Sequence, residues 1–140
     1  MVLRWYGCDI DPEKARSAAC QTYAPGDPAC NFPESDDTFE VFAKSCGLCK
    51  RSVPGKQAVD DFLSSTHEPL VVNVDQTMNG GYHGGHFVAV AGYDNSNYYV
   101  YDPGSSGGVF TVPAATFEGY MAGSPGTNTA FYKSDNGSCQ

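Results

Sequence analysis

The sequence predicts an α+β protein, because helical signals fill its first half and strand signals its second. Its 140 residues are 41% apolar and only 17% charged, a balance typical of a folded chain with a core. We therefore expect a single domain over residues 1–140, with a helical half at 1–67 and a β-sheet half at 68–140.

The first helical signals stand at the N-terminus. Residues 1–7 read as the last turns of a helix that Gly7 closes. Asp11 is a good N-cap and Pro12 suits the first helical position, so a helix is expected from there to about Tyr23.

Two more helices are expected before the sheet. One opens at Asp36 or Asp37 and ends near Gly47, and the other follows Gly55. The spacing i, i+1, i+4, i+5 gives this last helix one apolar face, formed by Ala58, Val59, Phe62 and Leu63.

After Pro69 the chain becomes rich in Val, Tyr and Phe, and Gly, Asn and Pro bound each run. We expect a mostly antiparallel sheet, with a hairpin turn at 94–97 and a short helix at about 114–120. The expected strands span residues 70–74, 86–93, 98–102, 109–112 and 130–133.

Charge and hydropathy narrow the range of partners. The net charge is −8, which disfavours nucleic acid and anionic membrane surfaces. The longest apolar runs are far shorter than a membrane span, so membrane insertion is not expected. A protein or peptide partner is favoured. Assembly is expected through the N-terminal apolar set, which should be buried against the chain's own sheet or another subunit: Val2, Leu3, Trp5 and Tyr6.

The cysteines indicate an extracellular or other oxidising compartment. An even set of six pairs most simply as three disulfides, although fifteen pairings are possible. The spacing of Cys46 and Cys49 also suits half a zinc site, but no second half completes it, so no metal or other cofactor is expected. Asn136 begins a glycosylation sequon, relevant only in a eukaryotic secretory pathway; no signal peptide precedes Cys8. The disulfide candidates are Cys8, Cys20, Cys30, Cys46, Cys49 and Cys139.

The stretch around His86 is the most informative about chemistry. His86 opens one expected strand and Asp102 closes its hairpin partner; with a rise of about 3.3 Å per residue, the two return to the same place. Asp102 would then fix the orientation of the imidazole, and Gly84 and Gly85 would leave room for a substrate chain. A buried His–Asp pair that merely braces the hairpin explains the same pattern.

The residues from Gly85-His86-Phe87-Val88 through Tyr101-Asp102-Pro103 resemble the His and Asp motifs of papain-like cysteine peptidases of the bacteriocin-processing (C39 and C39-like) family. The resemblance covers about residues 36–133 and implies a papain-like fold, with His86 as general base and Asp102 as its orienting partner. His83 lacks the apolar run that follows His86 and ranks below it.

The family also needs a thiolate at a helix N-terminus and an oxyanion donor, usually a glutamine before that cysteine. Cys8 stands at a suitable interval, but Asp9 and Asp11 follow it, and no glutamine precedes it. Residues 1–7 instead resemble the end of the family's nucleophile helix. On that reading the nucleophile lies upstream of Met1, and Cys8 is structural. Coincidental resemblance is the third possibility.

Two functions follow. The favoured one is a catalytically incomplete relative that acts as a binding or structural subunit. The alternative is an active thiol peptidase or amidase with Cys8, His86 and Asp102 as its triad.

Among weaker signals, residues 94–97 read as a turn rather than a calcium loop, and His67 reads as a surface residue.

Overall fold

The computed structural model of the chain describes residues 2–8, 43–44, 46–106, 108–124, 127–134, 136 and 138–139. Two compact units comprise Met1–Arg51 with Phe131–Gln140, and Ser52–Ala130. The helix after Gly55 shares a core with the strands that follow it, within the second of these units. The expectation of a single domain with halves at 1–67 and 68–140 stays a prediction.

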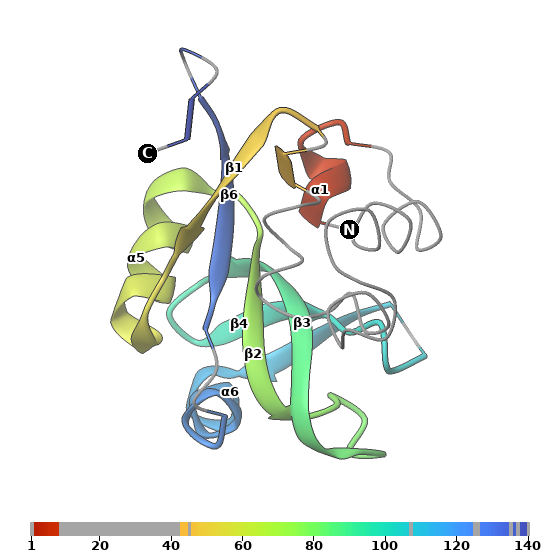
Figure 1. The fold of residues 1–140 in the computed structure, drawn as a ribbon. Helices are drawn as coiled ribbons and strands as arrows, with labels where there is room; N and C mark the ends of the chain where they lie inside the picture. Colours follow the sequence, from red (N-terminus) through yellow and green to blue (C-terminus); the bar gives the residue numbers. More distant parts are fainter. Residues whose placement is uncertain are drawn as a thin grey trace, which may run out of the picture. The chain divides into compact units, whose positions relative to one another are not determined.

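The unit Ser52–Ala130 is built on consecutive antiparallel strands. β2 pairs with β3, β3 with β4, and β4 with β5 (Figure 1). Two helices accompany them, and β6 begins in this unit, where Thr129 pairs with Val71 of β2. The elements are α5 (Gly55–Thr66), β2 (Leu70–Gln76), β3 (His83–Tyr93), β4 (Asn97–Tyr101), β5 (Val109–Pro113), α6 (Ala114–Ala122) and β6 (Thr129–Lys133).

The register places apolar side chains of neighbouring strands on one face of the sheet. Val90 lies opposite Leu70 of β2 and opposite Val100 of β4. Both helices bury their apolar residues in the same core, so they cover this face. The predicted apolar face of α5 is confirmed: Val59, Phe62 and Leu63 are buried, and Ala58 packs against the core.

A partly buried polar cluster joins α5 to the rest of this unit. Asp60 is buried on α5 and accepts a hydrogen bond from the hydroxyl of Tyr98 on β4. Lys56 lies 2.8 Å from Asp60 and 3.2 Å from Glu118 of α6. The hydroxyl of Tyr98 and the ammonium group of Lys56 therefore compensate the burial of the Asp60 carboxylate. The sequence pattern did not predict this cluster.

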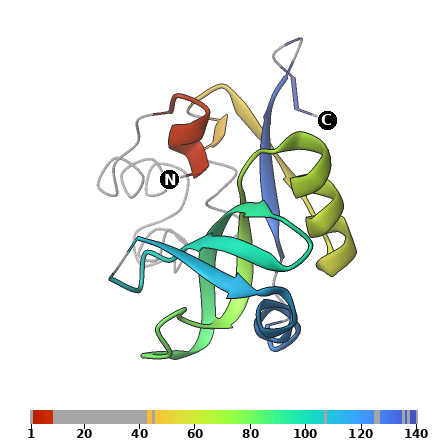
Figure 2. The ribbon, with the colours of Figure 1, turned by 180° about the vertical axis from the view of Figure 1, so that it is seen from behind.

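The β4–β5 hairpin leads directly into α6. Figure 2 shows β5 running into the helix, and the Ala114 N–H donates to the Ser96 carbonyl at 2.9 Å. The ring of Tyr98 stacks on Tyr93 at 4.6 Å and contacts Phe117 of α6 at 4.8 Å between ring centroids. Aromatic packing thus fixes α6 against β4.

The other unit contains α1 (Val2–Trp5), β1 (Leu48–Ser52) and the end of β6. Its described cysteines form two disulfides, Cys8–Cys46 and Cys49–Cys139.

The strands form a six-stranded antiparallel sheet in the order β1-β6-β2-β3-β4-β5. An α+β fold is therefore confirmed.

The N-terminal expectations are met in part. The short α1 helix ends before Gly7, whose φ of 81° is the left-handed conformation expected of a helix-closing glycine. Val2 is buried, but Trp5 is 62% exposed, so its expected burial against the chain's own sheet is wrong. Burial against another subunit stays a prediction.

The other expected helices and strands are found in the structure wherever the chain is described in full. The helix expected at 11–23 lies outside the described residues, and of the next only its end is described, where Ala43 and Lys44 are helical. The five predicted strands and the helix at 114–120 are present, with ends that differ by up to three residues. β1 was not predicted. No helix in the described ranges is long and apolar enough to cross a membrane.

Candidate functional site

The structure brings His86 and Asp102 into direct contact. His86 lies on β3 opposite Val74, and Asp102 follows the last residue of β4, which pairs with Ala89. The imidazole Nε2 lies 2.6 Å from Asp102 Oδ1, and the two side chains are 15% and 0% exposed. The predicted juxtaposition is present, whereas the catalytic roles of the two residues stay predictions.

Four donors surround the Asp102 carboxylate. Oδ1 accepts from His86 Nε2 and from the Gly104 N–H at 2.8 Å. Oδ2 accepts from the Met78 N–H and the Ser105 hydroxyl, both at 2.7 Å. Burial alone would raise the pKa of Asp102, but these hydrogen bonds together hold it below its ordinary value of 3.8. Asp102 is therefore a fixed anion at neutral pH.

This environment determines which nitrogen of His86 carries the proton. An ionised carboxylate only accepts hydrogen bonds, so the neutral imidazole has its proton on Nε2 and a lone pair on Nδ1. Within the described part of the chain, Nδ1 makes no hydrogen bond. The arrangement can thus accept a proton at Nδ1, which is the chemistry of a general base.

Gly104 lies close to the imidazole of His86. A Cβ atom at position 104 would lie 2.9 Å from His86 Cε1 and 3.0 Å from Thr77 Cγ2. Such distances are too short for carbon atoms, so the ring rests against the bare backbone of Gly104.

The glycines before His86 differ from each other in their surroundings. Gly84 has a φ of 150°, and a Cβ there would lie 2.6 Å from the hydroxyl oxygen of Tyr82. A Cβ at Gly85 would meet nothing within 4 Å, so Gly85 faces open space. Gly85 is therefore open on this side, whereas Tyr82, itself 53% exposed, covers Gly84. The role of both glycines in binding a substrate stays a prediction.

Each of the four described cysteines lies in a disulfide. Cys8, the candidate, is bonded to Cys46, so its sulfur is not a thiolate in this state. Cys49 is bonded to Cys139 rather than to Cys46, which excludes the zinc half-site in the structure as described. Cys20 and Cys30 lie outside the described residues. Two disulfides agree with the expected oxidising compartment.

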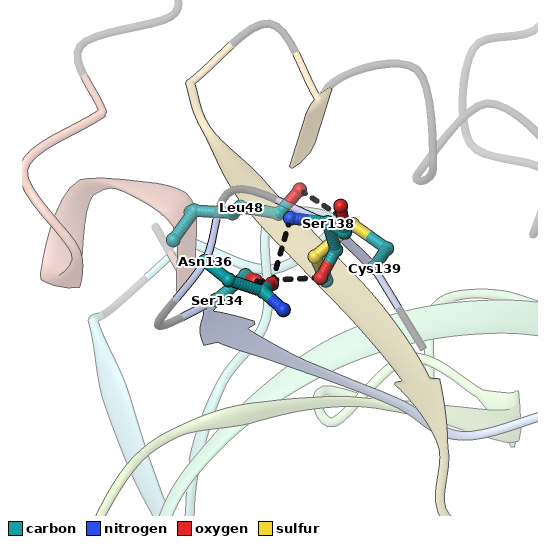
Figure 3. Close-up of a disulfide and its surroundings, with 6 residues drawn as sticks. Leu48, Ser134, Asn136, Ser138 and Cys139 are labelled. Atoms are coloured by element: carbon teal, nitrogen blue, oxygen red, sulfur yellow. Dashed lines mark hydrogen bonds between the residues drawn. A yellow bond between two sulfur atoms is a disulfide. The ribbon is translucent and has the colours of Figure 1, made fainter.

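The second disulfide lies beside the glycosylation sequon. Figure 3 shows Cys139 near Leu48, with Asn136 and Ser138 close by. Asn136 is exposed, and its side-chain oxygen accepts from the Ser138 N–H at 3.0 Å. Glycosylation of Asn136 stays a prediction.

The weaker candidates are structural where the chain is described. The Asp94 carboxylate accepts from the N–H groups of Ser96 and Asn97, which confirms a hairpin turn. His67 caps the end of α5 with a φ of 55° and is exposed, as expected. His83 is also exposed, at the start of β3.

Sequence reasoning missed several groups that hold the site. Met78 acts through its backbone N–H, which no residue pattern reveals. Gly104 and Ser105 stand in the run Asp102-Pro103-Gly104-Ser105, which reads as an ordinary turn. A serine three residues after a strand-ending aspartate was the one available signal, because its hydroxyl can return to the carboxylate.

Known proteins resemble this chain in sequence and in fold. Residues 56–123 match the model described as the Peptidase C39 like family. No protein of curated function matches the sequence.

Three solved structures share the fold. The peptidase domain of Streptococcus ComA, a bifunctional ABC transporter involved in a quorum-sensing pathway, is 19% identical with a TM-score of 0.66, and the match covers 95% of this chain and 85% of that one. A structure described as a C39-like peptidase from Bacillus anthracis is 18% identical with a TM-score of 0.52, covering 69% of this chain and 57% of its own length. The peptidase domain of Streptococcus mutans ComA, in complex with a small-molecule inhibitor, is 20% identical with a TM-score of 0.53, covering 70% and 74%. The chain therefore has the fold of these C39 peptidase domains, and its residues 56–123 are similar in sequence to the Peptidase C39 like family.

Proposed function

We propose that this chain is a C39-like domain that binds an extended segment of a protein or peptide beside His86 and performs no thiol chemistry of its own. The observation that carries the proposal is a contrast within the described residues. The His86–Asp102 pair is complete, while each described cysteine is in a disulfide. A thiol hydrolase needs a thiolate within reach of its base, and an oxidised sulfur cannot attack a carbonyl.

The end of β3 supports a peptide as the ligand. Tyr101, the last residue of β4, pairs with Ala89, whereas β3 begins six residues earlier at His83. Over residues 83–86 β3 has β2 on one side and, in the described part of the chain, no strand on the other. Phe87, the next residue, has an interaction of its own and is not counted in this edge. An extended peptide adds readily to such an edge through its backbone. The open space at Gly85 lies on the same stretch.

The alternative is an active thiol peptidase or amidase. The proton-accepting Nδ1 of His86 favours it, because a binding domain does not need an oriented imidazole. In that enzyme Cys8 would attack a carbonyl carbon, His86 would take the thiol proton and return it to the leaving amine, and Asp102 would hold the imidazole. The mechanism requires that the Cys8–Cys46 disulfide be reduced first.

A library of ten-residue peptides with blocked ends tests the proposal on the native, oxidised chain. We expect titration to shift the backbone amide signals of Gly84, Gly85 and His86 in ¹H–¹⁵N spectra, and mass spectrometry to find no cleavage. Gly85→Val should abolish the shifts, because it fills the open space, while Gly119→Ala on α6 should leave them unchanged. Cleavage that His86→Ala abolishes would contradict the proposal, as would the absence of shifts at these three amides. Cleavage only after reduction would establish the alternative.

A further inference from the structure

Ser105 connects two parts of the candidate site. The residue is 9% exposed, and its hydroxyl donates to Asp102 Oδ2 at 2.7 Å. The same oxygen accepts from the Asn79 N–H at 3.2 Å. One hydroxyl therefore links the carboxylate that orients His86 to the loop that joins β2 to β3.

The loop of residues 77–82 has a second attachment to the same carboxylate. The Met78 N–H donates to Asp102 Oδ2, so two consecutive backbone N–H groups of the loop end on Asp102 and Ser105. Thr77 closes the loop on itself: its hydroxyl accepts from the Tyr82 N–H at 3.0 Å. The loop is thus held at both ends, and its last residue is the exposed tyrosine.

Tyr82 reaches the surface proposed for peptide binding. Its ring lies over Gly84, two residues before His86. A movement of the loop would therefore displace the Tyr82 ring from Gly84. Loss of the Ser105 hydroxyl would leave the Asn79 N–H without its acceptor and Asp102 Oδ2 with one donor in place of two.

We propose that Ser105 is a positioning residue, which holds the His86–Asp102 pair in its orientation and fixes the β2–β3 loop so that Tyr82 lies over Gly84. The proposal rests on the proposed function only in assigning the site to a peptide. The positioning itself is a property of the unliganded chain.

Ser105→Ala tests the proposal in the oxidised chain, with Ser105→Thr to restore the hydroxyl and the exposed neighbour Ser106→Ala as control. We expect Ser105→Ala to shift the ¹⁵N signals of the His86 ring and to remove the NOE between the Tyr82 ring and the Gly84 Hα protons. Ser105→Thr should restore both, and Ser106→Ala should change neither. Unchanged His86 signals and a retained NOE in Ser105→Ala would overturn the proposal, whether or not any peptide binds.

Amide exchange of the wild-type chain keeps the proposal testable if Ser105→Ala does not fold. The N–H groups of Met78 and Asn79 should exchange slower than that of the exposed Gly81 by about tenfold or more, because their acceptors belong to the buried Asp102–Ser105 pair. Exchange of Asn79 as fast as that of Gly81 would overturn it.

Discussion

His86 Nε2 lies 2.6 Å from Asp102 Oδ1, and both side chains are largely withdrawn from solvent. The carboxylate also accepts hydrogen bonds from two backbone N–H groups and one hydroxyl. The full set fixes the plane of the carboxylate and, through it, the plane of the imidazole.

The ionisation of Asp102 should make stability depend on pH. Its pKa is lower in the folded chain than its ordinary value of 3.8, so its contribution is present above that value and is lost as the pH falls through the folded pKa. Asp102→Asn should lower the free energy of unfolding by about 1–3 kcal/mol at neutral pH and reduce its decline in acid. Urea unfolding from about pH 6 to about pH 2.5 measures both effects.

The exposed Asp61→Asn is the matched control for Asp102→Asn and should behave as wild type. An identical acid profile for wild type and Asp102→Asn would contradict the assignment of a buried, ionised carboxylate.

Gly104→Ala should disturb the site because the new Cβ would overlap His86 Cε1 and Thr77 Cγ2. We expect a loss of about 1–3 kcal/mol in unfolding free energy and a shift of the His86 Cε1–H signal in ¹H–¹³C spectra. Gly119→Ala lies in α6 with free space for a Cβ and should stabilise the chain by up to about 1 kcal/mol. If both variants left the His86 signal in place, the ring would not rest on Gly104.

Tyr98→Phe should weaken the cluster that joins α5 to β4. Asp60 loses the hydroxyl that compensates its burial, so the free energy of unfolding should fall by about 1–2 kcal/mol. Burial raises the pKa of Tyr98 above its ordinary value of 10.0, and the hydrogen bond to Asp60 raises it further. The stabilisation by the protonated phenol is therefore present below about pH 10 and is lost at higher pH.

Urea unfolding at about pH 8 and about pH 11 should consequently show a smaller difference for Tyr98→Phe than for wild type. The exposed Tyr82→Phe serves as control and should retain the wild-type difference. Equal pH dependence in all three proteins would show that Tyr98 ionises freely in the folded chain.

The Cys49–Cys139 disulfide should contribute strongly to stability, because it joins residues 90 positions apart. Cys139→Ser should lower the free energy of unfolding by about 2–5 kcal/mol, seen as a lower Tm in calorimetry. The neighbouring Ser138→Ala should have a far smaller effect, since its contacts in Figure 3 lie at an exposed surface. A Tm for Cys139→Ser equal to that of wild type would exclude this bond from the folded chain.

The sequence predicted those features that local chemistry determines. The turn at Asp94 sets where β3 and β4 begin to pair, so the approach of His86 and Asp102 across the hairpin could be foreseen. β1 could not, because Lys50 and Arg51 have weak strand propensity and the strand depends on a distant partner, β6, and on a disulfide to Cys139. Ser105 was missed because its role exists only once the β2–β3 loop lies against it.

The oxidation state of the cysteines decides whether this chain performs thiol chemistry, and the intact mass of the native chain, treated with a thiol-alkylating reagent under non-reducing conditions, measures it. We expect a mass that corresponds to three disulfides among the six cysteines and no added label, so that His86 and Asp102 have no thiol to activate. Labelling at Cys8 with Cys46 also free would contradict the proposed function, and would make the chain a candidate thiol peptidase.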